Sequence, residues 1–271
     1  MNKTKKNHYL SQCISKNFIQ NGNKTFWQYD CLEGGAIKSK NIANLFSKRR
    51  LWGQELEDTL GRQMENQISP ILQHFSECFL ERKRIPGPTG FVEPQFNGIF
   101  VENEENRKIL SKLLLQLILL QRSSEAQPDP EIEEMLIRFF SLDSNIMKMP
   151  LALIEINPLM NAPPLILTDG MLFTFAAPTT KKNSLGQINF SFPINPQRLL
   201  IWGELKVIDY FVAKYKNIHH LNLCRIEQLE KRCIIASQDK KYLEMLVSVI
   251  PHFNSGEKSI QISALRDWPR S

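Results

Sequence analysis

The sequence has no hydrophobic segment long enough to cross a bilayer. Its longest apolar run, LLLQLILL at 113–120, has eight residues and contains Gln116, whereas a membrane-spanning helix needs about 20 mostly apolar residues. The first residues are polar and basic, without the apolar core of an export signal. These absences predict a cytoplasmic protein that does not contact a membrane.

Cysteine is scarce, and its spacing fits no metal motif. The five cysteines, at positions 13, 31, 78, 224 and 233, form no Cys-x-x-Cys pair and no Cys/His zinc spacing. An odd number of scattered cysteines favours reduced thiols in the cytosol. The sequence also lacks a P-loop, a dinucleotide-binding glycine fingerprint, a His-Glu-x-x-His motif and a nucleophile elbow, so it does not indicate any of the enzyme classes that these motifs define.

What the sequence does have is enough length for a full core and an uneven charge. It has 271 residues, 42% hydrophobic and 23% charged, with a net charge of +6, which is ordinary for a globular protein. Residues 1–50 contain ten lysines and arginines against two acids, residues 51–135 eight against fifteen, and the remainder sixteen against eleven. The basic parts suit nucleic acid, whose phosphates attract Lys and Arg, but they could equally be a solvated surface. The acidic segment 51–135 could bind a protein partner.

Two short stretches of the N-terminal half carry turn signals. KTFWQYD at 24–30 and AIKSK at 36–40 flank a pair of glycines, which predicts a β-hairpin. The stretch 83–100 contains three prolines and three glycines, which predicts an irregular loop.

Helical spacing governs much of the region up to residue 150. Apolar residues from Leu56 to Phe79 recur every three or four positions, which predicts a helix over 54–80 with a bend at Pro70. A second helix is expected over 105–122. Asp129, followed by proline and several glutamates, has the composition of a helix start.

Strands dominate the second half of the chain, which then becomes helical. Apolar runs separated by Pro-, Gly- and Asn-rich turns predict strands at LALIEI, PLILT, MLFTFAA, INFSF and LLIWG. A helix is expected over 204–231, a strand over 233–237 and a helix over 239–249. This order predicts an α+β fold, with a mixed or antiparallel sheet packed against a central helical bundle. We expect one domain over residues 1–271, with a basic arm and hairpin (1–50), a mainly helical region (51–150) and a strand-rich, then helical region (151–271).

Several stretches together resemble one family. NHYLSQCISKNF at 7–18 is similar to the His-Tyr-Val-Pro-Gln opening of an uncharacterised, mostly bacterial family, the domain of unknown function numbered 4238. In the same order, further segments of that family resemble WQYDCLEGGAI, ELEDTLGRQMENQISPIL, LLLQLILLQRSSE, ILTDGMLF, FPINP and EKRCIIAS, so the resemblance covers nearly the whole chain. The chain departs from the pattern at Asn7, Ser11 and residues 168–171. Membership implies a shared fold and site, but the family has no agreed activity.

His8 and Gln12 are the first candidate site residues. If 8–12 is a strand, their side chains lie on one face. Histidine exchanges protons near neutral pH, and Gln12 could orient a substrate or a water molecule. The alternative is a structural role for His8 at a strand edge, although the family pattern favours a site. Lys5 and Lys6 would attract a phosphate beside them.

Carboxylates on separate elements are candidate metal ligands. Glu57 and Glu65 line one face of the predicted helix and could hold Mg²⁺ or act as a base, or they could be ordinary charges beside an apolar seam. Asp169 begins an Asp-Gly pair that is typical of a hairpin turn. In a functional role it would join Glu204 and Lys206 in the Asp…Glu-x-Lys pattern of magnesium-dependent nucleases.

The candidate residues together predict a nucleic-acid-processing effector. Arg122 and Arg232 could bind phosphate in a bidentate manner, or they could form salt bridges to the acidic segment. The expected activity is a nuclease that cleaves RNA or DNA, within a bacterial defence or toxin system, with a catalytic set of His8, Gln12, Glu65 and Asp169. The alternative is a non-catalytic module that binds nucleic acid or protein. The pair at 219–220, His-His, is expected on the surface.

Overall fold

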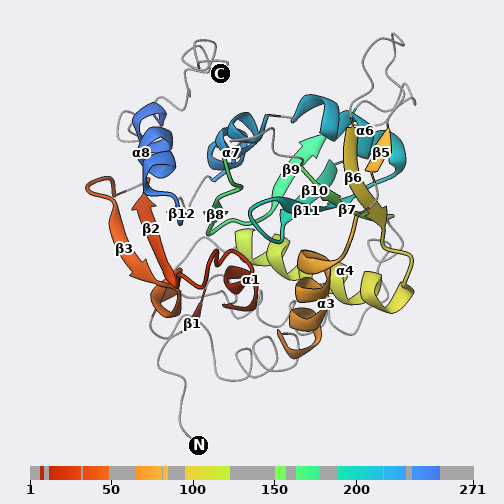
Figure 1. Ribbon diagram of the computed structural model, residues 1–271, viewed down its shortest axis with the longest axis horizontal. Helices are drawn as coiled ribbons and strands as arrows, with labels where there is room; N and C mark the ends of the chain where they lie inside the picture. Colours follow the sequence, from red (N-terminus) through yellow and green to blue (C-terminus); the bar gives the residue numbers. More distant parts are fainter. Residues whose placement is uncertain are drawn as a thin grey trace, which may run out of the picture.

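The computed structural model describes residues 7–8, 12–31, 33–48, 65–80, 82–84, 95–122, 150–156, 163–177, 188–215, 217–229 and 234–250. These residues form antiparallel sheets with helices packed against them, so the predicted α+β class is confirmed (Figure 1). No helix within these ranges is long and apolar enough to cross a membrane.

The largest sheet has the strand order β5-β6-β7-β11-β10-β9, and all neighbours are antiparallel. The strands are β5 (Arg82–Arg84), β6 (Gln95–Phe100), β7 (Leu151–Glu155), β9 (Phe173–Ala176), β10 (Ile188–Pro193) and β11 (Arg198–Trp202). Strands β7 and β11 are buried on both faces, because LALIE and RLLIW are almost continuously apolar. Helix α6 (Leu205–Lys214) lies on one side of this sheet, and α3 (Glu65–Glu77) and α4 (Glu104–Arg122) lie on the other (Figure 1).

Aromatic rings join α6 to the sheet. Phe173 and Phe175 point to the same face of β9, since they are two residues apart. The Phe175 ring lies 4.8 Å from that of Phe211, and the Phe173 ring lies 5.2 Å from that of Tyr215, edge to face. Such pairs stabilise packing by about 0.5–1.5 kcal/mol beyond their buried area.

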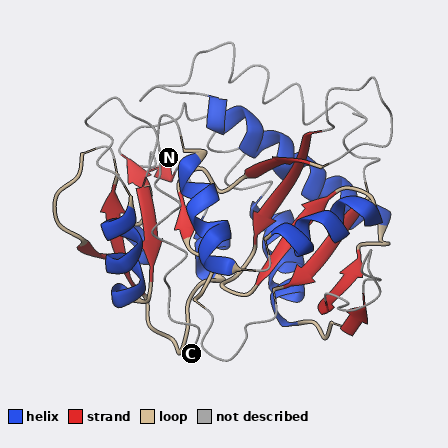
Figure 2. Cartoon of the chain, turned by 90° about the horizontal axis from the view of Figure 1, so that it is seen from above, coloured by secondary structure: helices blue, strands red, loops and turns tan. Residues whose placement is uncertain are grey.

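A second sheet has the order β3-β2-β12-β8. Its strands are β2 (Thr25–Asp30), β3 (Lys38–Asn41), β8 (Leu167–Thr168) and β12 (Ile234–Ser237). One face, which includes Tyr29, packs on α8 (Lys240–Val249) through Leu243 and Leu246. The other face, which includes Phe26, belongs to the main core together with residues of the larger sheet. Figure 2 shows this sheet and α8 beside the larger sheet.

The N-terminal strand closes a small sheet of its own. β1 (Asn7–His8) pairs with β4 (Ser47–Lys48), which places His8 opposite Ser47. Helix α1 (Gln12–Lys16) follows, and the short 3-10 helix η1 (Ile42–Asn44) connects β3 to β4. His8 and Gln12 therefore belong to different elements, and the expectation that one strand carries both is wrong.

The predicted helix over 204–231 is two helices. Helix α6 ends at Lys214, and α7 (Ile218–Glu227) starts after Asn217, whose Oδ1 accepts hydrogen bonds from the backbone N–H groups of His219 and His220. An asparagine at this position satisfies amide groups that a helix leaves without partners, so the chain restarts here. Asp239 does the same for α8, where it accepts from the Tyr242 N–H at 3.0 Å.

Gln228 covers the outer edge of the largest sheet. Its Oε1 accepts from the backbone N–H of Thr174 at 2.9 Å, and its Nε2 donates to the carbonyl of the same residue. Thr174 lies in β9, the last strand in the order. The side-chain amide thus makes the pair of hydrogen bonds that a neighbouring strand would make.

The predicted hairpin around the glycine pair is confirmed. β2 and β3 are antiparallel, with Trp27 opposite Ser39. Gly34 and Gly35 between them have φ angles of 68° and 90°, which glycine adopts without steric cost.

Two local predictions are wrong. Within 83–100 the structure has strands β5 and β6, which pair with Arg82 opposite Asn97, so the proline-rich stretch does not exclude a hairpin. The Asp-Gly pair at 169–170 is not a hairpin turn, because β8 belongs to the second sheet and β9 to the largest sheet. The chain crosses between sheets at this point.

The predicted helix over 54–80 is described only from Glu65 to Glu77, with Ile68, Ile71, Leu72 and Phe75 buried. Residues 54–64 lie outside the described residues, as does the helix start expected at Asp129. Phe79 was expected on the buried seam, but it is 88% exposed because the helix ends before it. The helix expected over 105–122 is confirmed as α4.

Candidate functional site

The structure describes only part of the predicted N-terminal site. His8 lies in β1, opposite Ser47, and Gln12 is the first residue of α1. Lys5 and Lys6 lie outside the described residues.

The predicted carboxylates lie on three separate segments. Glu65 is the first residue of α3, Asp169 follows β8, and Glu57 lies outside the described residues. Asp169 extends the pairing of β8 with β12, since its N–H donates to the Ile234 carbonyl at 3.0 Å and its Oδ1 accepts from the Ile234 N–H at 3.2 Å. In the described ranges no group of three or more His, Cys, Asp or Glu side chains could hold a metal ion. The predicted Mg²⁺ site therefore stays a prediction.

The Asp…Glu-x-Lys pattern does not form on neighbouring strands. Glu204 precedes α6 at the end of β11, in the largest sheet, whereas Asp169 follows β8 in the second sheet. Both Glu204 and Lys206 are exposed. The interpretation of this pattern as a nuclease centre is wrong. Of the two predicted phosphate-binding arginines, Arg122 ends α4 and Arg232 lies outside the described residues.

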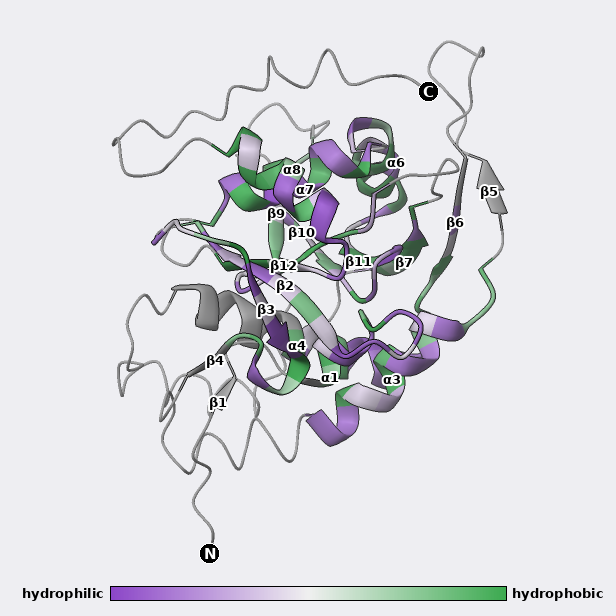
Figure 3. Cartoon of the chain, turned by 60° about the vertical axis from the view of Figure 1, so that its left-hand side comes forward, coloured by the Kyte–Doolittle hydropathy of each residue, from purple (hydrophilic) through white to green (hydrophobic). Residues whose placement is uncertain are grey.

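Basic side chains gather at the outer strand of the second sheet. Lys38 and Lys40 lie on β3, and Lys24 is next to its end because the Ile42 N–H donates to the Lys24 carbonyl at 2.9 Å. Lys48 follows in β4, directly opposite Asn7 in β1. We call these four lysines the basic edge. Figure 3 shows the hydrophilic character of β3 beside the more hydrophobic inner strands.

The basic edge keeps its charge uncompensated within the described structure. Lys24 and Lys38 are exposed and Lys40 is half-buried, and no described carboxylate forms an ion pair with any of the three. Lys38 and Lys40 are two residues apart on a strand, so they project to the same side. The β1–β4 pairing brings His8 next to this surface.

A second polar cluster, which the sequence did not predict, lies inside the protein on α7. Asn222 is fully buried, and its Nδ2 donates to the Tyr242 hydroxyl and to the Pro164 carbonyl, each at 2.8 Å. Its Oδ1 accepts from the Ile166 N–H at 3.2 Å. One side chain thus ties α7 to α8 and to the segment that leads into β8.

Arg225 is the charged member of this cluster. It is 4% exposed, and its guanidinium donates to the Ile166 carbonyl at 2.9 Å and to the Thr168 hydroxyl at 3.4 Å. No described group accepts from its Nε, and no described carboxylate forms an ion pair with it. Burial lowers the pKa of Arg225 to about 9, so the guanidinium is still charged at neutral pH.

Perturbed groups concentrate around α7. Among the described residues, eight titratable groups have a shifted pKa, and six of them are Lys214, Tyr215, His219, Cys224, Arg225 and Tyr242. Such clustering is typical of functional sites, although structural networks also produce it. The sequence signal was the run NIHHLNLCRIE, in which polar residues at 219, 222 and 225 share a helix face with buried apolar residues.

The expectation that both histidines of the pair lie on the surface is wrong for His219. It is buried, and its Nδ1 lies 3.4 Å from the Tyr242 hydroxyl. Burial, and secondly the charge of His220, lower the pKa of His219 below its ordinary 6.5.

Acidification is therefore expected to destabilise the fold through His219. The unfolded imidazole takes up a proton near its ordinary pKa of about 6.5, while the folded one does so only at lower pH. The contribution to stability is full above about pH 6.5 and is lost as the pH falls toward the lowered pKa, with a slope of at most about 1.4 kcal/mol per pH unit. Urea unfolding at successive pH values measures this slope. It should weaken in His219→Asn and persist in the control His74→Asn, an exposed histidine; an unchanged slope in His219→Asn would contradict the assignment.

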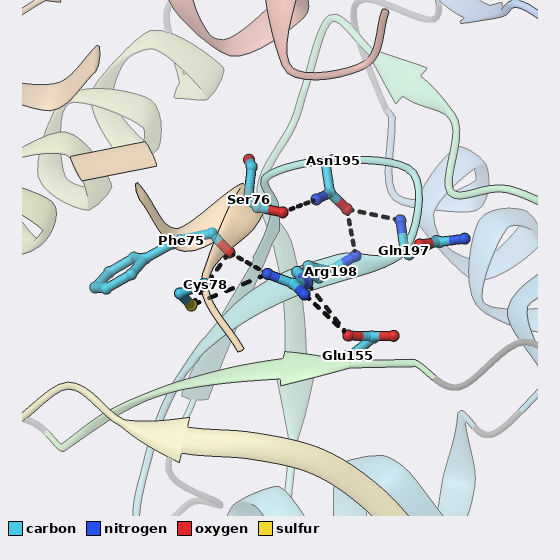
Figure 4. Close-up of polar contacts among 7 residues, drawn as sticks. All are labelled: Phe75, Ser76, Cys78, Glu155, Asn195, Gln197 and Arg198. Carbon is cyan, nitrogen blue, oxygen red and sulfur yellow. Dashed lines mark hydrogen bonds and ion pairs between the residues drawn. The ribbon is translucent and has the colours of Figure 1, made fainter. Parts of the chain in front are cut away.

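Arg198 holds the end of α3 against the largest sheet (Figure 4). Its Nη1 donates to the Phe75 carbonyl at 2.8 Å, and its Nη2 lies 3.2 Å from Glu155 Oε2. Asn195 adds a hydrogen bond to the Ser76 carbonyl. Carbonyls in the last turn of a helix lack helical partners, so this cluster has a structural role and its cation is already engaged.

The four cysteines among the described residues, at positions 13, 31, 78 and 224, carry thiols rather than disulfides. Comparison of the chain with known protein families, with curated proteins and with solved structures gives no significant match. The resemblance to the domain of unknown function 4238 therefore stays a prediction.

Proposed function

We propose that this protein binds nucleic acid at the basic edge and processes phosphodiesters there with His8. The observation that carries the proposal is the row of lysines on β3, which has no ion pair to a described carboxylate and lies next to the β1–β4 pair that contains His8. Each lysine that contacts a phosphate displaces a condensed counterion, and this release favours binding regardless of base sequence.

The arrangement suits backbone recognition better than base readout. Lysine is a compact point charge on a flexible stem, so it attracts phosphate without the fixed two-point geometry of arginine. Successive lysines on one side of a strand are about 6.6 Å apart, which is close to the spacing of successive phosphates in an extended strand. A single-stranded or locally opened substrate fits this surface.

His8 would supply the chemistry at this surface. An imidazole near its ordinary pKa takes a proton from an attacking hydroxyl or water, or gives one to the leaving oxygen. If the carboxylates Glu57, Glu65 and Asp169 hold Mg²⁺, the metal would supply the charge stabilisation. The predicted setting, a bacterial defence or toxin system, belongs to this proposal.

Charge removal at β3 tests the binding step. In fluorescence anisotropy with labelled single-stranded RNA and DNA, Lys38→Ala/Lys40→Ala should bind about tenfold more weakly, and its slope of log K against log salt should fall by about 1.8, since each lost phosphate contact removes about 0.9. The charge-matched control is Lys108→Ala/Lys112→Ala on α4, which should bind as the wild type does. Equal affinities for the two double variants, or no binding at about 50 mM salt, would reject the proposal.

A further inference from the structure

The strongest unassigned feature lies on the outer side of α7. Cys224 and His220 are one helical turn apart, and Cys224 Sγ lies 3.6 Å from His220 Nε2 and 3.9 Å from its Nδ1. Both side chains are half-buried, so an ion in solution can reach them. The basic edge does not use either residue.

The separation of the two atoms matches that of two ligands of one metal ion. In tetrahedral zinc sites the metal–sulfur distance is about 2.3 Å and the metal–nitrogen distance about 2.0–2.1 Å, which places sulfur and nitrogen about 3.6 Å apart. A hydrogen bond from thiol to imidazole spans a similar separation, so a metal titration must distinguish the two.

The surroundings hold the pair in place. The Tyr215 ring stacks on the imidazole of His220, with centroids 6.0 Å apart and planes 20° apart. A ring fixed in this way loses little rotamer freedom when it binds a ligand. Lys214 lies over the Tyr215 ring at 5.3 Å from its centroid, on the far end of the same aromatic group.

We propose that His220 and Cys224 form a binding site for a thiophilic divalent cation such as Zn²⁺. The protein supplies one nitrogen and one sulfur ligand, and water completes the coordination. On binding, the Cys224 thiol releases its proton to solvent and the thiolate forms the bond to the metal. Imidazole and thiolate together favour Zn²⁺ over Mg²⁺ or Ca²⁺.

The charged groups around the thiol set the pH dependence. Burial, and secondly the charge of Glu227, raise the pKa of Cys224, while the Lys214 ammonium opposes this shift. Near neutral pH the thiol is therefore protonated, and each bound metal must displace one proton. The affinity should rise about tenfold per pH unit near neutrality, since one proton is released per ion.

Cobalt substitution gives a direct test on the full chain. Addition of Co²⁺ to the reduced wild-type protein should produce the near-ultraviolet charge-transfer band of a cobalt–thiolate bond, and Zn²⁺ should displace it. The band should be lost in Cys224→Ser, and the affinity should fall at least tenfold in His220→Ala. The controls Cys78→Ser and His74→Ala carry equivalent substitutions on or beside α3 and should bind as the wild type does.

A second measurement needs no variant and so does not depend on folding of the mutants. In the wild-type protein, Zn²⁺ should protect Cys224 from alkylation while Cys78 still reacts, as peptide mass spectrometry would show. The absence of a thiolate band, unchanged affinity in His220→Ala, or equal alkylation of Cys224 with and without Zn²⁺ would each overturn the proposal.

Discussion

Arg225→Ala is expected to lower the free energy of unfolding by about 3–5 kcal/mol, the range for large-to-small changes at fully buried sites. The substitution removes the donors to the Ile166 carbonyl and the Thr168 hydroxyl. Each buried acceptor left without a partner costs about 1–3 kcal/mol. The truncation also leaves a cavity between α7 and β8. Because a typical domain is stable by only about 5–15 kcal/mol, the variant should be close to unfolding at physiological temperature.

Arg225→Met separates the two causes of that loss. Methionine fills most of the volume and removes a buried charge that has no ion pair to a described carboxylate. Replacement of a buried charge by an apolar residue of similar size is often neutral or stabilising, so Arg225→Met should cost about 1–2 kcal/mol, mainly for the unsatisfied acceptors. Urea unfolding measures both variants. A loss below about 1 kcal/mol in Arg225→Ala would show that the buried network does not support the fold.

The second large effect is expected at His8. His8→Ala should lower the rate of nucleic-acid cleavage by about 10²–10⁴, the usual contribution of a positioned general acid or base. Its affinity for the substrate should change little, because the phosphate contacts of Lys38 and Lys40 are intact. Cleavage of end-labelled RNA and DNA, with and without Mg²⁺, measures the rate, and the anisotropy assay measures the affinity.

Two controls make the His8 result specific. The exposed His74, replaced by alanine, should leave cleavage unchanged. A thermal unfolding curve of His8→Ala separates a site residue from an architectural one, since a melting temperature lower by several degrees indicates the latter. If the wild-type protein binds nucleic acid but cleaves none, the cleavage hypothesis fails and the protein is a non-catalytic binding module.

Local signals predicted those elements whose partners are close in sequence. The glycine pair between two alternating stretches was sufficient for the β2–β3 hairpin, because the turn conformation itself selects glycine. The buried strands β7 and β11 were visible as apolar runs, since a strand covered on both faces has no polar side. Helix α4 followed from its spacing in the same way.

Predictions failed where the partner of a segment is distant. The Asp-Gly pair has the composition of a turn, but nothing local indicates that the strands on its two sides enter different sheets. The buried polar residues of α7 have the same difficulty. Asn222 and Arg225 are satisfied by Pro164, Ile166 and Thr168, more than fifty residues away. A helical pattern shows which face a residue occupies, but it does not show which backbone groups meet it.

The edge covered by Gln228 has a consequence for how the protein behaves at high concentration. An uncovered outer strand offers its amide and carbonyl groups to any extended chain, and this exchange is a common route to aggregation. Here both backbone groups of Thr174 are already bonded within the same molecule, so a second chain cannot add a strand there without displacing the glutamine. The opposite kind of edge, β3, repels another copy through its lysines. Self-association by strand exchange is thus opposed at one boundary by saturation of hydrogen bonds and at the other by like charge.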